Sequence, residues 1–466
     1  MQKSKLAELI QSLNQYEVKA FKSYLDSPYF NENKKVNKCF DAVLAFNKQK
    51  QEFSRKELHK KINGIARFND QQIRYLLTDL TKHLEYYITL KGFDKEVLLQ
   101  NTICAKELAK RDCEKSYQYR HHLIKQNDEV KNSMFYYHQF VAADHHLNYT
   151  GSKQSRKKKL DYQDTLLHLE TFYLSRKLQL FCEVINLKNI LSGDFDLHLF
   201  KEIKEIATKE PFSKIPVVQI YYHILLTLTD ADNEKNFNRL RELLIKHGPL
   251  FPVLELKDMY QYVKNYCVKK INQGSTSFVK TLFEIYKTML ADKRLMNAGY
   301  LSQWEYKNMV SIGLRLNEKN WCRTFINMYI NYLLPAERKN SLAYNLAYWY
   351  FMNGDFKKAL KQLQDVVFTD VFYQLDARVI LLKAYYELDE VETFFYHASA
   401  FRLFLLRNRT ISEYQRTINR NLIKFLTRLV RSGVSNSKLL KLKQEIAAEK
   451  NVADLNWLNE KVEALI

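Results

Sequence analysis

The sequence is poor in the residues that interrupt regular structure. Glycine occurs 10 times and proline 6 times in 466 residues, whereas globular proteins contain roughly 7% and 5% of them. Turns and strand ends draw heavily on both residues, so the composition argues against a β-sandwich, a β-barrel or an open α/β sheet. We therefore expect an all-α protein.

The few glycines are also far apart, since no two of them lie within ten residues of each other. A dinucleotide-binding G-x-G-x-x-G, a P-loop and a G-x-S-x-G nucleophile motif each need two glycines within about eight positions. The sequence excludes all three motifs. Its paired carboxylates fit helix caps or exposed faces better than acid/base catalysis, so we expect no enzyme, no catalytic residue and no cofactor.

Disulfide and membrane signals are missing too. None of the six cysteines forms a C-x-x-C pair, and we expect them as small apolar side chains in a reducing compartment. The longest nearly apolar run, 215–228, is interrupted by polar residues and is shorter than the ~20 residues of a membrane span. The first residues lack the apolar core of a signal peptide. A soluble, cytoplasmic protein without membrane contact is predicted.

Acidic residues are outnumbered by basic ones. Lys and Arg total 73 against 52 Asp and Glu, which gives a formal net charge of +21. The excess is absent from 301–400 and densest in 401–466. Such a surplus favours anionic partners, either nucleic acid or acidic proteins. A Lys-rich solvated surface is the alternative interpretation.

Apolar residues recur at helical spacing along most of the chain. The pairs Asn14/Glu17 and Ser54/Glu57 have the spacing of capping boxes, which mark helix starts. A long helix is expected over about 70–90. The basic run 150–159 has no periodicity and predicts a mobile surface loop.

These patterns suggest four parts. We expect an N-terminal helical module in 1–92, irregular helical hairpins in 93–304, repeats in 305–402 and basic helices in 403–466.

The third part contains a repeat. In 343–366 the positions that form the pattern are Leu346, Ala347, Tyr350, Gly354, Phe356, Ala359 and Leu363. Their spacing resembles the tetratricopeptide repeat, in which small residues let two helices pack closely and aromatic residues fill the wedge between them. The pattern recurs less closely 35 residues earlier and later. It predicts an α-solenoid of antiparallel helical hairpins, with a generic helical pair as the alternative.

Three further stretches, 25–31 (LDSPYFN), 265–272 (NYCVKKIN) and 384–388 (AYYEL), resemble an uncharacterised family of bacterial helical-repeat proteins. The resemblance implies an all-helical, soluble, cytoplasmic protein. It implies no activity, substrate or catalytic residue.

Histidines gather around His121 and His138. His138 and His145 share a helical face, and His121 lies about one helix earlier, so these imidazoles could converge on a metal ion. No H-E-x-x-H or E-x-x-H spacing occurs, however, and no cysteine is nearby. We predict core or half-exposed histidines and no metal, with a metal site as the alternative.

The long helix at 70–90 carries polar residues away from its apolar face, namely Arg74, Tyr75, Thr78 and Lys82. Together with the helix expected at 54–62 they could imitate a DNA-binding helix-turn-helix. The connection 63–69 is longer than the usual turn, and Asp70 and Asp79 would face phosphates. A purely structural capping module is therefore preferred, and DNA binding remains the alternative.

A basic row follows one face of the helix expected at 411–431. Its members are Arg416, Arg420, Lys424, Arg428 and Arg431. The opposite face carries an apolar stripe made of Ile411, Tyr414, Ile418, Leu422, Phe425 and Leu429. Glu413 is the only acid in this segment, so an uncompensated row should cost stability unless an anion answers it. We predict a partner-binding row, against a solvated face as the alternative.

Together these features predict a non-enzymatic scaffold or adaptor that binds a protein partner on a helical-repeat surface. The alternative is a nucleic-acid-binding regulator that uses the N-terminal module and the basic surface.

Overall fold

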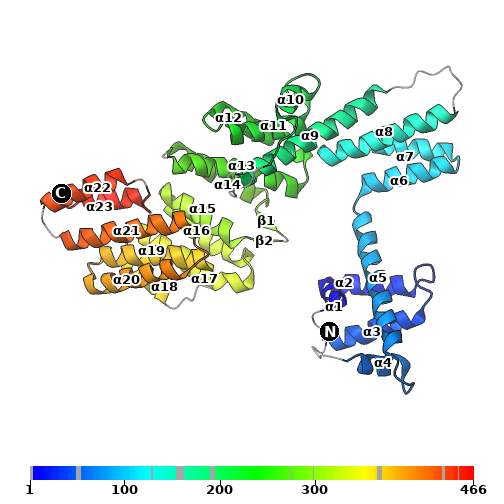
Figure 1. The fold of residues 1–466 in the computed structure, drawn as a ribbon, viewed down its shortest axis with the longest axis horizontal. Helices are drawn as coiled ribbons and strands as arrows, with labels where there is room; N and C mark the ends of the chain where they lie inside the picture. Colours follow the sequence, from blue (N-terminus) through cyan, green and yellow to red (C-terminus); the bar gives the residue numbers. More distant parts are fainter. Residues whose placement is uncertain are drawn as a thin grey trace. The chain divides into compact units, whose positions relative to one another are not determined.

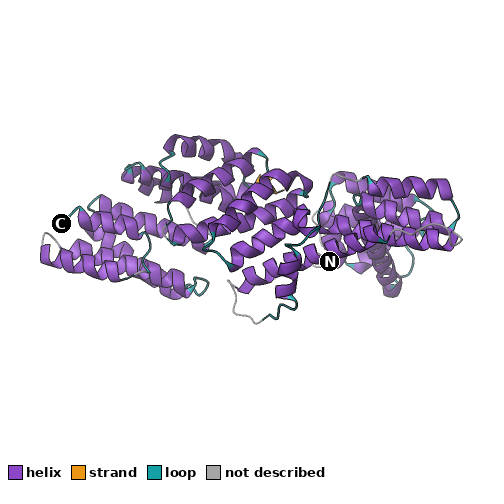
Figure 2. Cartoon of the chain, turned by 90° about the horizontal axis from the view of Figure 1, so that it is seen from above, coloured by secondary structure: helices purple, strands orange, loops and turns teal. Residues whose placement is uncertain are grey.

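The computed structural model of the chain describes residues 4–48, 54–126, 130–153, 162–188, 195–273, 275–297, 299–364, 370–432, 436–449 and 451–466. Helices make up nearly all regular structure in these residues (Figure 2). A two-residue ladder joins β1 (Met296–Asn297) to antiparallel β2 (Tyr300–Leu301). The predicted all-α fold is confirmed. The chain divides into two compact units, unit 1 (residues 1–222) and unit 2 (residues 223–466).

Figure 1 labels the helices of both units. Unit 1 contains α1 (Lys5–Ser12), α2 (Gln15–Asp26), α3 (Lys34–Lys48), α4 (Arg55–Asn63), α5 (Asp70–Phe93), α6 (Val97–Lys110), α7 (Glu114–Lys125), α8 (Ser133–Lys153), α9 (Gln163–Lys188), α10 (Phe200–Ile206) and the 3₁₀ turn η1 (Phe212–Lys214). The helix α11 (Pro216–Thr229) spans the division.

Unit 2 continues with α12 (Glu234–His247), η2 (Gly248–Leu250), α13 (Val253–Asn272), α14 (Ser277–Ala291), α15 (Gln303–Arg315), α16 (Lys319–Tyr329), η3 (Ile330–Tyr332), α17 (Pro335–Met352), α18 (Phe356–Gln364), α19 (Val371–Glu387), α20 (Val391–Arg407), α21 (Glu413–Ser432), α22 (Asn436–Ala448) and α23 (Leu455–Glu463). None of the described helices is both long enough and apolar enough to cross a membrane.

The first five helices share one core, in which each of α1 to α4 packs against α5. Both predicted capping boxes are confirmed. The backbone N–H of Asn14 donates to Glu17 over 2.9 Å, and that of Ser54 donates to Glu57 over 2.6 Å. These reciprocal bonds satisfy amide groups that a helix start leaves without partners, and so they fix where α2 and α4 begin.

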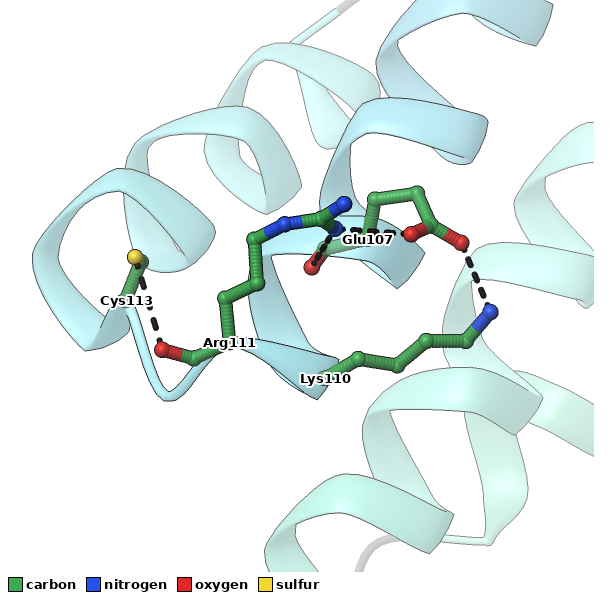
Figure 3. A network of polar contacts seen from close by, with 4 residues as sticks. All are labelled: Glu107, Lys110, Arg111 and Cys113. Carbon is green, nitrogen blue, oxygen red and sulfur yellow. Dashed lines mark hydrogen bonds and ion pairs between the residues drawn. The ribbon is translucent and has the colours of Figure 1, made fainter.

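A tight turn joins α6 to α7 (Figure 3). Asp112 adopts a positive φ of 55°, which reverses the chain direction within three residues. Just before the turn, the carboxylate of Glu107 accepts hydrogen bonds from Lys110 (2.6 Å) and Arg111 (2.7 Å). These two cations lower the pKa of Glu107 to about 2. Glu107 is therefore ionised and able to pair with both cations at any physiological pH.

The basic run at 150–159 is only partly as predicted. The helix α8 continues to Lys153, so the first four residues of that run are helical rather than loop. The hydroxyl of Thr150 donates to the carbonyl of His146 over 2.6 Å, which satisfies the hydroxyl within the helix. The remaining residues of the run, 154–159, lie outside the described residues.

Three hairpins in unit 2 have the same type of turn between their two helices. They are α15/α16, α17/α18 and α19/α20, and the residues with positive φ in their turns are Asn317 (61°), Gly354 (79°) and Asp389 (56°). In each hairpin the next residue donates its N–H to the carbonyl five positions earlier, over 2.9–3.0 Å. This is the Schellman ending of a helix. The spacings of 37 and 35 residues between these turns give the hairpins a common length.

Small residues set the distance between the helices of these hairpins. Ala347 and Ala359, both predicted contact residues, are completely buried between α17 and α18. A Cβ atom added to Gly313 on α15 would lie 2.6 Å from Cys322 Sγ on α16. Close packing of backbones at these positions thus requires the small side chains.

From α13 to α23 each described helix packs on its neighbours in the sequence, as expected of a solenoid. Some contacts reach further along the chain. Asp454, just before α23, pairs with Lys383 on α19 over 2.9 Å, and Trp457 Nε1 donates to Glu387 over 3.0 Å. We call these two contacts the α19–α23 clasp. It joins helices about 70 residues apart and covers the side of α19.

Candidate partner-binding surface

The helix α21 is strongly amphipathic, as predicted. Leu422, Phe425 and Leu429 from the predicted stripe are buried, and Ile423 and Leu426 widen the buried face. Tyr414 is different, because it lies in the first turn and 62% of it is exposed. Its assignment to the buried stripe was wrong. Ile411, the first residue of the stripe, is buried just before α21, so the departure from the predicted stripe is at Tyr414 in the first turn of the helix.

The five residues of the predicted basic row have different environments. Arg416 is a structural residue: its side chain is 21% exposed and donates to the carbonyls of Leu405 (3.1 Å), Asn408 and Ile411 (both 3.3 Å). Helix ends leave such carbonyls without partners. Arg416 therefore caps the C-terminal end of α20, and it pairs with Glu413 as well.

Arg428 is also committed within the chain. Its guanidinium binds the carboxylate of Glu445 on α22 through both of its terminal nitrogens, one of them over 2.9 Å. This bidentate bond is the main cause of the lowered pKa of Glu445, to which the nearby Lys441 and Lys424 add. The row was predicted to be uncompensated. At Arg428 it is compensated, by an acid 17 residues away.

Arg420, Lys424 and Arg431 remain exposed, and we call them the basic strip. In the described part of the chain none of the three makes a side-chain hydrogen bond or an ion pair. Lys424 lies 5.1 Å from the ring centre of Phe425, and Arg431 lies 5.1 Å from that of Phe395 on α20. The strip lies on α21, which packs against both α20 and α22 (Figure 1). The structure thus brings together three of the five predicted residues.

The α20 side of the strip adds apolar surface. Arg402 on α20 donates to Thr427 on α21 over 3.1 Å, which places its face of α20 along the seam. Leu406 (65% exposed) follows one turn later on that face, and Leu403 (44%) and Tyr396 (79%) are exposed about 100–120° around α20 from it. Exposed aliphatic and aromatic residues beside free cations are the composition of a protein interface.

The histidines pack against one another rather than around a common point. The rings of His121 and His146 stack with their centres 4.2 Å apart, and Tyr117 bonds to Nδ1 of His146 over 2.9 Å. Burial lowers the pKa of His121 to about 4. Nowhere in the described residues do three His, Cys, Asp or Glu side chains gather in a way that could hold a metal ion.

Sequence reasoning missed a group of buried lysines. Lys264, Lys307 and Lys383, on α13, α15 and α19, pair with Glu305, Asp376 and Asp454 respectively. Lys307 also lies within 5.6 Å of the ring centres of Trp304, Tyr344 and Tyr373. Each lysine is therefore satisfied inside the array. Only Lys383 carried a signal in the sequence, because it is the one charged residue in the run 379–386.

Comparison with protein-family models, with curated proteins and with solved structures finds no match for this chain. The resemblance to bacterial helical-repeat proteins therefore stays a prediction, as do the four-part division and the partner-binding role of the basic row.

Proposed function

We propose that the protein is a non-enzymatic scaffold or adaptor, and that an acidic segment of a partner protein binds along the basic strip. The observation that carries the proposal is the exposure of Arg420, Lys424 and Arg431, none of which forms an ion pair within hydrogen-bonding distance among the described residues. Like charges at this spacing repel one another, and a bound carboxylate would relieve that repulsion. The tetratricopeptide-like hairpins would serve as the rigid support of the strip.

Apolar neighbours favour a protein over nucleic acid at this place. Leu406 and Leu403 offer a phosphate backbone nothing to bind, whereas a partner helix with acidic and apolar faces would cover them together with the strip. Such a helix gains hydrophobic contact from α20 and charge complementarity from α21. The cations would mainly raise the association rate, and the apolar contacts would mainly slow dissociation.

A photo-crosslinking amino acid placed at Leu406 tests this proposal in cells. We expect it to capture one partner at an acid-rich segment, identified by mass spectrometry of the crosslinked peptide. The double variant Arg420→Glu/Lys424→Glu should lower the crosslink yield about tenfold at low salt, with a smaller loss at high salt. Arg428 is left unchanged because it holds α22.

Ile245 on α12 provides the matched control, since it is 71% exposed and distant in sequence from the strip. The same crosslinker there should not capture the same segment. Crosslinks from position 406 to nucleic acid, or an undiminished yield after the charge reversal, would contradict the proposal.

A further inference from the structure

The outer face of α5 is a second surface without a role in the proposed function. The helix buries Ile73, Leu76, Leu80 and Leu84 against α1 to α4, which leaves its opposite face in solvent. Five positions along that face are exposed, namely Gln71, Arg74, Tyr75, Thr78 and Lys82. The exposed stretch covers about 17 Å of helix at 1.5 Å per residue.

A shallow cavity of about 720 Å³ lies between this face and the start of α3. Polar side chains dominate its lining, which includes Asn33, Lys35, Gln71, Tyr75, Thr78, Lys82 and one acid, Asp79. Amide, hydroxyl and ammonium groups of this kind bind base edges and phosphates. Because this lining lacks the exposed aliphatic residues found along α20, a protein partner would gain little hydrophobic contact here.

The segments that precede α5 carry more exposed basic than acidic residues. On α3, α4 and the connection to α5 the exposed acids are Asp41 and Glu57, and the exposed lysines and arginines are Lys34, Lys35, Lys38, Arg55, Lys56, Lys60, Lys61 and Arg67. Asp70, which the sequence suggested would repel phosphates, binds Arg55 over 3.1 Å and Arg74 over 2.7 Å. Its hydrogen bond to Arg55 is the main reason why its pKa is lowered. Its negative charge is thus compensated within the surface.

The geometry points to double-stranded DNA as the ligand of this surface. We propose that the exposed face of α5 enters the major groove, which is about 12 Å wide and admits one α-helix. Lys35 and Lys82, on either side of the cavity, bind phosphates of the backbone, and Gln71 reaches a base edge. The connection 64–69 between α4 and α5 is longer than that of the common helix-turn-helix. We therefore expect α5 to dock on DNA at a different angle from the recognition helix of that motif.

Fluorescence anisotropy of the full chain with a labelled duplex of about 30 base pairs tests the proposal at about 50 and 200 mM salt. We expect Lys35→Ala/Lys82→Ala to weaken binding about tenfold or more at the lower salt. The slope of log K against log salt should become shallower by about 2, one unit for each phosphate that no longer meets a lysine. All positions are exposed, so the unfolding midpoint should not change.

Lys235→Ala/Lys246→Ala on α12 is the matched control, because both lysines are equally exposed but lie in unit 2. It should leave duplex binding unchanged. Gln71→Ala should erase the preference for duplexes selected from a random pool, while affinity for bulk DNA stays within about twofold.

Three results would overturn the proposal: equal losses in the control and in the α5 variant, tighter binding of a single-stranded RNA of the same length, or loss of duplex binding on reversal of the basic strip. The last result would move the nucleic-acid site to α21. Unchanged duplex binding in the strip variant keeps this inference separate from the proposed protein partner.

Discussion

Two basic surfaces of this protein differ in what lies between their cations. On the exposed face of α5 the residues between Arg74 and Lys82 are Tyr75 and Thr78, and a polar cavity adjoins them. Beside the strip on α21 the neighbours are Leu403, Leu406 and Tyr396 of α20. The charges alone would attract the same anions to both places. The uncharged neighbours distinguish them, since polar side chains suit base edges and phosphates and apolar ones suit a protein face.

The supporting structure of the two surfaces differs as well. In the row on α21, Arg416 and Arg428 hold neighbouring helices together and leave the other three cations exposed. On α5, Arg74 serves both purposes, because it compensates Asp70 and is itself exposed. A basic residue in a row is therefore not by itself a binding residue. Its hydrogen bonds to carbonyls and carboxylates of other helices decide its role.

The largest effect that we expect is on acid unfolding. As the pH falls, unit 1 should unfold before unit 2. Burial lowers the pKa of five histidines packed on α7, α8 and α9, namely His121, His138, His145, His146 and His168. Three histidines of unit 2, His223, His247 and His397, share this shift. The stacked pair in unit 1 makes double protonation especially unfavourable there.

The direction in which stability changes with pH follows from proton binding. The pKa of His121 is about 4 when folded and about 6.5 when unfolded. Its contribution, of the order of 3 kcal/mol, is present above pH 6.5 and lost as the pH falls toward 4. All four tryptophans lie in unit 2. Helical circular dichroism should therefore decrease at a higher pH than tryptophan fluorescence changes, and simultaneous changes would contradict the expectation. His121→Phe should shift the first transition to lower pH.

Arg416→Ala should destabilise unit 2 by about 1–3 kcal/mol, because it leaves carbonyls at the end of α20 without donors. Arg420→Ala should cost less than about 0.5 kcal/mol, since this side chain is exposed. Urea unfolding followed by tryptophan fluorescence measures both free energies. Equal costs would mean that the division of the basic row into structural and exposed members is wrong.

The smallest effect concerns Asp79, the half-buried acid among the residues that line the α5 cavity. Asp79→Asn removes a charge that repels phosphate, so duplex affinity should rise about two- to fivefold at low salt. Asp258→Asn on α13 changes net charge equally at an exposed position in unit 2 and should have no such effect. Weaker duplex binding in Asp79→Asn would argue that the carboxylate accepts a hydrogen bond from a base, and the repulsion argument would then be wrong.

Local features of the fold could be predicted from the sequence because they depend on residues close together in the chain. The boxes at Asn14 and Ser54 and the start of α5 at Asp70 follow from spacings of three or four residues. The burial of Leu422 and Phe425 follows from helical periodicity. The end of α8 was missed because Thr150 satisfies its hydroxyl on its own helix, which a polar composition does not reveal.

The candidate site could be predicted only in part, because the partners of Arg416 and Arg428 lie on other helices. Glu445 lies one helix beyond Arg428, and the carbonyls that Arg416 caps belong to α20 and the turn after it. Periodicity within a single helix carries no information about either partner. It also placed Tyr414 in the buried stripe, although this residue is exposed in the first turn of α21. Which cations stay free is decided by the packing of α20, α21 and α22 together.

The α19–α23 clasp affects how unit 2 folds while the chain is being synthesised. Most contacts of unit 2 join neighbouring helices, so each hairpin has its partners soon after it leaves the ribosome. Lys383 and Glu387 are exceptions, because Asp454 and Trp457 are synthesised about 70 residues later. Until then a largely buried lysine and a glutamate stand without these partners on α19. A chain interrupted before Asp454 would keep this defect permanently and present it to the proteases that remove unfinished proteins.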